Sequence, residues 1–191
     1  WPGVIPDLVG RAIKAAEELG FDLCVHPATG QLLGVLAGGV APGGVIGETG
    51  TGTGAGLAWM ATSAGPDVAL VSVELDAERA EAATRVFAHT PNVTVIHGDA
   101  GDLFNRGPFD LLVHDGGWGA GKDGGVRIQP GDVLKVGGVM TVDDYTPFKA
   151  WPPLFRGEPD DSRVFWLDHP EMLATEICVT PTMAVILARR T

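Results

Sequence analysis

A glycine-rich segment early in the chain restricts the fold more than any other part of the sequence. Residues 47–54 read Gly-Glu-Thr-Gly-Thr-Gly-Thr-Gly. A short strand pattern at 45–48 runs into this segment, and a helix pattern at 55–63 leaves it. Glycine lets a backbone turn tightly and approach a ligand closely. The order strand, glycine loop, helix therefore predicts a ligand site at the carboxyl end of a strand in an open α/β sheet.

The rest of the chain alternates between strand and helix patterns. The mostly apolar run at 68–73 is typical of a strand buried on both faces of a parallel sheet. We expect further strands at 93–96, 109–113 and 139–142, the last after a turn at Gly137-Gly138. We expect helices at 11–19, 30–37, 76–88 and 160–167, and a short helix or turn at 101–104. This alternation indicates a doubly wound, Rossmann-like α/β fold with helices on both faces of the sheet.

The end of the chain departs from the alternation. Only residues 180–182 join the expected strands at 176–179 and 183–188. Parallel neighbours need a connection of roughly a dozen residues, so a link this short forces an antiparallel hairpin. We predict one domain over residues 1–191, with a sheet that is mostly parallel and whose last strand is antiparallel.

The composition argues against several classes of partner. The formal net charge of −11 repels the phosphate backbone of nucleic acids and anionic lipid surfaces. No apolar run approaches the roughly 20 residues that span a bilayer, and no basic start precedes an apolar stretch as in a secretory signal. Cys24 and Cys178 set no disulfide framework and are interpreted as buried core thiols. We expect a cytoplasmic protein that binds a small molecule and neither nucleic acid nor membrane.

The glycine loop leaves two cofactors open. A P-loop is excluded because no Lys-Ser or Lys-Thr pair follows the last glycine. Gly50, Gly52 and Ala55 satisfy the dinucleotide fingerprint G-x-G-x-x-G/A, which is a weak signal alone. Glu74 ends the second expected strand, where a carboxylate can accept hydrogen bonds from ribose hydroxyls. That role fits NAD and S-adenosylmethionine equally well.

Three further features favour S-adenosylmethionine. Glu48, at the mouth of the loop, would repel a pyrophosphate and attract the cationic amino group of a methionyl moiety. Asp99 follows the third expected strand, where it can accept a hydrogen bond from the adenine amino group. The antiparallel hairpin at the end of the chain is unusual for a dinucleotide-binding fold.

Together these segments resemble those of a known family. Residues 45–57, 73–76, 98–100 and 109–115 resemble the successive cofactor motifs of class I methyltransferases, which use S-adenosylmethionine. Residues 27–33 and 176–190 are similar to the lead-in helix and closing hairpin of the small catechol and caffeoyl-CoA O-methyltransferases. The resemblance covers nearly the whole chain, and it implies a seven-stranded sheet with its last strand antiparallel.

The resemblance also assigns the cofactor contacts. It implies that Gly50 and its neighbours hold the methionyl part, Glu74 the ribose, and Asp99 with Ala100 the adenine. The family usually has Ser or another hydrogen-bonding residue where Gly56 stands, so some cofactor contacts there are lost or replaced by water. The expected cofactor-binding positions are Glu48, Gly50, Thr51, Gly52, Gly56, Glu74, Asp99 and Ala100.

Three carboxylates follow two strands that are neighbours in this fold. Asp115 comes just after the fourth expected strand, and Asp143 and Asp144 come just after the fifth. Like charges this close are unfavourable unless a cation joins them, and carboxylate oxygens suit a hard ion such as magnesium. The family's metal pattern is an Asp and a later Asp-Asn pair, for which this chain has Asp143-Asp144. The alternative is that these acids cap loops or face solvent.

The expected catalytic residues lie in the same region. A bound metal would polarise an acceptor hydroxyl and lower its pKa, which creates the nucleophile, and Asp115 would act as one ligand. The family carries a lysine soon after the fourth strand, proposed there as the base, and Lys122 matches it at a longer spacing. His114 and His26 are alternative bases, since Lys122 could equally be a solvated loop residue.

Aromatic residues follow the acidic pair. They are Tyr145, Phe148 and Trp151. Trp118 lies in the loop after the fourth expected strand. Aromatic side chains at the mouth of such a site suit a flat, apolar acceptor, although a packed lid without substrate contact is an alternative.

We therefore expect an enzyme that transfers a methyl group from S-adenosylmethionine to a hydroxyl of a small, aromatic molecule, assisted by Mg²⁺ or another divalent cation. Three alternatives stay open: metal-independent transfer to nitrogen, carbon or carboxylate, an NAD-linked oxidoreductase, and a cofactor-binding protein without catalysis. One fold hosts many chemistries, so the fold cannot decide among them. The resemblance and the apolar C-terminal hairpin make a homodimer a reasonable expectation.

Overall fold

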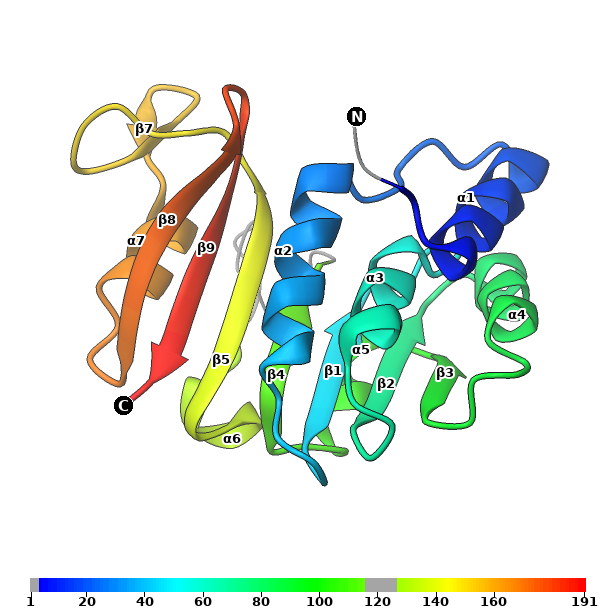
Figure 1. Cartoon of the computed structure of the whole chain (residues 1–191). Helices are drawn as coiled ribbons and strands as arrows, with labels where there is room; N and C mark the ends of the chain where they lie inside the picture. The colour runs from blue at the N-terminus through cyan, green and yellow to red at the C-terminus, as the bar shows by residue number, and fades with distance from the viewer. Residues whose placement is uncertain (1–3, 116–126) are drawn as a thin grey trace.

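The computed structural model describes residues 4–115 and 127–191 (Figure 1). Its helices are α1 (Asp7–Leu19), α2 (Pro27–Gly38), α3 (Ala55–Ser63), α4 (Ala77–Val86), α5 (Ala100–Phe104), α6 (Pro130–Val133) and α7 (Asp161–Leu167). Its strands are β1 (Val45–Thr49), β2 (Ala69–Glu74), β3 (Val93–His97), β4 (Phe109–His114), β5 (Leu134–Tyr145), β6 (Leu154–Phe155), β7 (Glu158–Pro159), β8 (Met172–Thr180) and β9 (Met183–Arg190). The helix expected at 55–63 is confirmed to the residue.

Seven strands form one sheet in the order β3-β2-β1-β4-β5-β9-β8. Strands β1 to β5 are parallel, and β9 pairs antiparallel with both β5 and β8. In Figure 1 the parallel strands point upward, whereas the β9 arrow points down toward the C-terminus. The predicted Rossmann-like α/β fold is confirmed, including the mostly parallel seven-stranded sheet and its antiparallel last strand.

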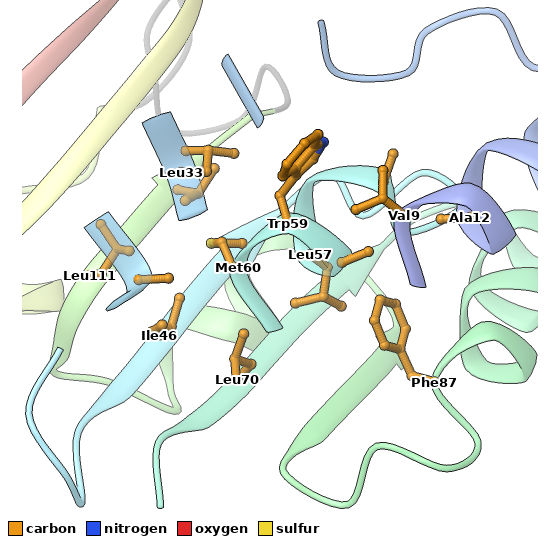
Figure 2. Close-up of a cluster of buried hydrophobic side chains, with 14 of the residues drawn as sticks. Val9, Ala12, Leu33, Ile46, Leu57, Trp59, Met60, Leu70, Phe87 and Leu111 are labelled. Atoms are coloured by element: carbon orange, nitrogen blue, oxygen red, sulfur yellow. The ribbon is translucent and has the colours of Figure 1, made fainter. Parts of the chain in front are cut away.

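Two apolar clusters pack the helices against the sheet. One contains Leu57 and Met60 of α3 together with Leu111 of β4, as Figure 2 shows. The other contains Leu112 of β4 and Trp166 of α7. Leu111 and Leu112 are adjacent in sequence, and they enter different clusters because successive side chains of a strand point to opposite faces. Burial on both faces explains why the inner strands read as continuous apolar runs.

The fifth strand corrects the sequence prediction. The sequence predicts a turn at Gly137-Gly138 and a strand at 139–142, but β5 runs through both glycines. Gly137 has a φ of 82°, which glycine adopts without strain. A Cβ at Gly138 would lie 2.8 Å from the carbonyl oxygen of Phe109 on the neighbouring strand. The glycines therefore allow an irregularity and a close backbone approach inside one long strand.

Three smaller findings complete the comparison with the sequence. The patterns predicted neither α6 nor the two-stranded hairpin of β6 and β7. The interpretation of both cysteines as buried core thiols is wrong, because Cys178 is exposed and Cys24 only partly buried. Among the described residues, no helix is both long and apolar enough to cross a membrane.

Candidate active site

A cavity of about 820 Å³ lies at the carboxyl ends of the parallel strands. The ends of β1, β2, β4 and β5, the glycine loop and the segment between α1 and α2 contribute to its wall. All the cofactor-binding positions predicted from the sequence line it: Glu48, Gly50, Thr51, Gly52, Gly56, Glu74, Asp99 and Ala100. The predicted metal ligands Asp115, Asp143 and Asp144 line it as well.

The glycine loop is tied to the adjacent strand β2. The backbone amides of Gly50 and Thr51 donate hydrogen bonds of 2.9 and 3.1 Å to the carbonyl oxygen of Val73. Gly52 has a φ of 55°, and a Cβ there would lie 2.9 Å from the ring of Phe21. A larger residue at position 52 would be strained and would collide with the aromatic ring that packs on the loop.

Glu48 lies in β1, directly before the glycine loop, and is buried in the cavity wall. Its Oε2 accepts a 2.5 Å hydrogen bond from the hydroxyl of Ser72, which lies 2.5 Å from the hydroxyl of Thr51. The hydroxyl groups of Thr51 and Ser72 share a hydrogen bond in which either oxygen can be the donor. Burial raises the pKa of Glu48 to about 8; the bond from Ser72 opposes this shift, and the charges of Asp143 and Glu74 add to it.

Gly56 makes room for the Glu48 carboxyl group. A Cβ at position 56 would lie 2.7 Å from Oε1 of Glu48. The bond from Ser72 holds the other carboxyl oxygen, so a serine side chain at 56 would force the carboxyl group to move. Glycine at this position, where the family usually has Ser or another hydrogen-bonding residue, therefore leaves space for the Glu48 carboxyl group.

Glu74, at the end of β2, is buried and already bonded on both oxygens. Oε2 accepts a 2.7 Å hydrogen bond from the amide of Gly52. Oε1 accepts from the amide of Asp76 at 2.9 Å and from the guanidinium of Arg79 at 2.9 and 3.1 Å. Arg79 in turn lies over the ring of Phe21, 5.0 Å from its centroid. These contacts join the glycine loop, β2 and α4 around one carboxylate.

Asp99 and Ala100 stand at the start of α5. Oδ1 of Asp99 accepts a 2.7 Å hydrogen bond from the amide of Gly101, and the Asp102 carboxylate accepts a 3.0 Å bond from the amide of Asp99. This reciprocal pattern is a capping box, which fixes the first turn of the helix. It holds the Asp99 side chain at the edge of the cavity.

The three predicted metal ligands converge. One carboxylate oxygen from each of Asp115, Asp143 and Asp144 lies within 4.8 Å of the other two. The acids meet because β4 and β5 are parallel neighbours that end at the same edge. The hydroxyl of Thr49 donates a 2.7 Å hydrogen bond to the carbonyl oxygen of Asp115, which fixes the backbone at Asp115. Three hard oxygen donors at this spacing fit a divalent cation such as Mg²⁺.

The predicted bases have different positions. Lys122 lies outside the described residues. His114 is buried with its Nδ1 2.9 Å from the hydroxyl of Thr49, and it does not line the cavity, which argues against it as a base. His26 lines the cavity and forms the N-cap of α2.

The aromatic residues predicted at the mouth of the site are only partly brought together. Tyr145 is buried and lines the cavity, and burial raises the pKa of its phenol to about 12. Phe148 and Trp151 meet edge to face at 6.5 Å, but neither lines the cavity. Trp118 lies outside the described residues.

Sequence reasoning missed the polar residues that support the site. Ser72 interrupts the apolar run of β2, and a hydroxyl in a doubly buried strand is the signal that could have revealed it. Arg79 and Arg163 gave no comparable signal, because their partners are known only once the chain is folded.

Comparison with protein families identifies the domain. A family described as a methyltransferase domain matches residues 48–145, which is more than half of the chain. The match begins at Glu48 and ends at Tyr145, so it contains the glycine loop, Glu74 and Asp99 as well as the three convergent acids. No curated protein matches the chain in sequence.

Solved structures share the fold over nearly the whole chain. The O-methyltransferase TomG from Streptomyces achromogenes, in complex with SAM, has a TM-score of 0.74 and 22% identity, with 98% of this chain and 91% of that chain covered. The O-methyltransferase from Bacillus cereus, in complex with SAH, has a TM-score of 0.74 and 17% identity, with 98% and 92% covered. The SAH-bound methyltransferase PaMTH1 from Podospora anserina has a TM-score of 0.72 and 19% identity, with 98% and 89% covered. The family match and the sheet topology together show that this chain belongs to the methyltransferase-domain family.

Proposed function

We propose that this protein transfers a methyl group from S-adenosylmethionine to a hydroxyl of a small aromatic acceptor, with the help of a divalent cation. The observation that carries the proposal is that one cavity has two chemically different ends. The glycine loop, Glu74 and Asp99 lie at the ends of β1, β2 and β3, whereas the three convergent acids lie at the ends of β4 and β5, on the other side of β1 in the sheet. TomG and the Bacillus cereus enzyme, which share the fold, are O-methyltransferases in complex with SAM and SAH.

The first end suits an adenosyl cofactor. The cationic amino group of the methionyl part would meet Glu48 and favour its ionised form. Oε2 of Glu74 accepts one hydrogen bond from Gly52, which leaves a second lone pair for a ribose hydroxyl. Asp99 and Ala100 line the cavity where the adenine would lie in this assignment.

The second end suits the acceptor. In the transfer, the acceptor oxygen forms a bond to the methyl carbon while the carbon–sulfur bond breaks, and the electron pair of that bond returns to sulfur. The hydroxyl proton leaves to a base, for which Lys122 is the candidate in the sequence. A cation held by Asp115, Asp143 and Asp144 would supply charge that lowers the pKa of the hydroxyl. Tyr145 and Thr146 wall this end of the cavity and would orient the acceptor for in-line attack.

Calorimetry and a transfer assay test the proposal. We expect the purified protein to bind S-adenosylhomocysteine and to bind NAD far more weakly. With methyl-labelled S-adenosylmethionine and Mg²⁺, we expect label on catechol, used as the probe acceptor. Binding of NAD without any response to the sulfur ligands would overturn the assignment in favour of an oxidoreductase. Binding of the sulfur ligands without transfer to any hydroxyl acceptor would favour the non-catalytic or metal-independent alternatives.

A further inference from the structure

The strand that carries two of the three acids ends in a bulge. The pairing of β5 with β9 shifts register between Val142 and Tyr145. Asp143 and Asp144 lie within this shift, and Asp144 has a φ of 60°, a left-handed conformation that Asp adopts more readily than most residues. A β-bulge next to a functional site changes the direction in which the neighbouring side chains point. The directions of these two carboxylates therefore depend on what holds the chain after the bulge.

The guanidinium group of Arg163, in α7, holds that chain. Arg163 is only 3% exposed. Its Nη1 donates a 2.9 Å hydrogen bond to the carbonyl oxygen of Thr146. Its Cζ lies 4.6 Å from the ring centroid of Tyr145 and 5.9 Å from that of Phe148. One cation thus contacts three of the residues that follow the bulge.

Two carboxylates fix Arg163 from different elements. Asp160 lies 3.2 Å from its Nε and also caps α7, by accepting a 3.1 Å bond from the Arg163 amide. Oε2 of Glu176, on β8, lies 3.2 Å from Nη1. The other oxygen of Glu176 accepts a 3.0 Å bond from the amide of Phe148. Glu176 therefore binds both the post-bulge backbone and the cation that holds it.

We propose that Arg163 and Glu176 are positioning residues for the acceptor end of the cavity. They hold the segment at 145–148 in place. Through this segment they determine the directions of the Asp143 and Asp144 carboxylates and the positions of Tyr145 and Thr146 in the cavity wall. Neither Arg163 nor Glu176 lines the cavity, so both act through the residues they hold. The glycine loop and β2 supply the cofactor end through separate contacts. The inference rests on the proposed function for what the acceptor end does.

The variant Glu176→Gln tests the pair with little risk to folding. It removes one charge, while Asp160 still neutralises Arg163 and the amide oxygen of Gln can still accept from Phe148. Arg163→Lys is the second variant. Lysine keeps the positive charge but lacks the planar guanidinium group, which can donate to several partners at once. Glu81→Gln is the matched control, since Glu81 forms an exposed ion pair with Arg85 on α4.

Three measurements separate positioning from general destabilisation. Hydrogen exchange followed by mass spectrometry reports opening of 141–149, which we expect to accelerate by about tenfold in both variants and not in the control. Binding of Mn²⁺, followed by electron paramagnetic resonance, should weaken by about tenfold or more, as when a residue that orients metal ligands is lost. Affinity for S-adenosylhomocysteine should change less than about twofold, because the cofactor end is contacted separately.

Unchanged exchange at 141–149 would overturn the inference. So would a loss of S-adenosylhomocysteine affinity as large as the loss of Mn²⁺ affinity, because that result indicates a purely structural role. Wild-type protein that methylates no acceptor would count against the proposed function alone. The exchange result would then decide the role of Arg163 and Glu176, because it needs no acceptor, cofactor or metal.

Discussion

The backbone amide of Gly52 donates a 2.7 Å hydrogen bond to Oε2 of Glu74, so the glycine loop and the end of β2 are joined through the carboxylate that we assign to the ribose. Oε1 of the same group is bound to Asp76 and Arg79. This arrangement fixes Glu74 before any ligand arrives. A ribose hydroxyl has a lone pair available on Oε2, and a hydroxyl at Oε1 would have to compete with Arg79.

Replacing Glu74 should therefore weaken cofactor binding strongly. Glu74→Ala removes the ribose acceptor and leaves the Gly52 amide without its partner. We expect affinity for S-adenosylhomocysteine to fall by about 2–3 kcal/mol, or roughly 30- to 150-fold, the scale for losing charge-assisted hydrogen bonds. Calorimetry measures the change, with Glu18→Gln on α1 as a control for loss of one exposed acid. Unchanged affinity in a folded Glu74→Ala protein would show that the ribose lies elsewhere.

Glu48 should make stability depend on pH. Burial raises its pKa from an ordinary value of 4.5 to about 8, so between these values the folded chain keeps a proton that the unfolded chain releases. A state that binds more protons is weakened as pH rises, so the free energy of unfolding should fall from pH 4.5 toward 8 and then level off. Glu48→Gln, which cannot ionise, should lose this contribution.

Urea unfolding at several pH values between 5 and 9 gives the measurement. The difference in the free energy of unfolding, wild type minus Glu48→Gln, should decrease as pH rises, by at most about 1.4 kcal/mol per pH unit. Taking the difference cancels the other titrating groups that both proteins share. A difference that is flat or rises with pH would contradict a buried, protonated Glu48.

The sequence predicted the fold well, and it predicted the site in part, for identifiable physical reasons. The glycine loop, Glu74 and Asp99 follow directly from strand ends, because the carboxyl edge of a parallel sheet collects whatever residue follows each strand. The convergence of Asp115 with Asp143 and Asp144 follows from the same rule. The hydrogen bond between Glu48 and Ser72 was missed because the two residues are cross-strand partners, which no local pattern reveals.

Long-range contacts also explain the remaining differences. The turn predicted at Gly137-Gly138 is wrong because glycine serves both turns and strand irregularities, and only the pairing with β4 distinguishes them. Arg163 looked like an ordinary helical residue, yet its partner Glu176 lies on β8. Tertiary context of this kind overrides local propensity.

Gly56 should resist substitution although it lies in a helix. Alanine there would place a Cβ 2.7 Å from Oε1 of Glu48. We expect Gly56→Ala to destabilise the protein by about 1–3 kcal/mol through overpacking, partly offset by the helix propensity of alanine. Gly10→Ala in α1 is the control, since a Cβ at Gly10 meets nothing within 4 Å. That variant should gain roughly 0.5–1 kcal/mol.

Thermal and urea unfolding of the two alanine variants measure both effects. Equal stability gains at Gly56 and Gly10 would show that the Glu48 carboxyl group moves aside freely. In that case Gly56→Ser should also bind S-adenosylhomocysteine as well as the wild type does. We expect instead that both variants at position 56 bind it more weakly, because Glu48 is displaced from the cavity wall.

The acidic trio yields the prediction that separates the metal-assisted mechanism from its alternative. Asp143 lies on β5, whereas the cofactor contacts assigned above lie on the glycine loop, β2 and α5. The charge of Asp143 raises the pKa of Glu48, so its loss would not weaken the attraction of Glu48 for the cofactor's amino group. Asp143→Ala should therefore abolish most methyl transfer to catechol while leaving S-adenosylhomocysteine affinity nearly intact. Removal of divalent ions with a chelator should have the same effect on the wild type, and added Mg²⁺ should restore turnover of the wild type but not of the variant. If transfer survives exhaustive chelation, the acids do not work through a cation. Metal-independent transfer, with Lys122 or His26 as the base, would then lead, and Asp143→Ala would report only the loss of a wall residue.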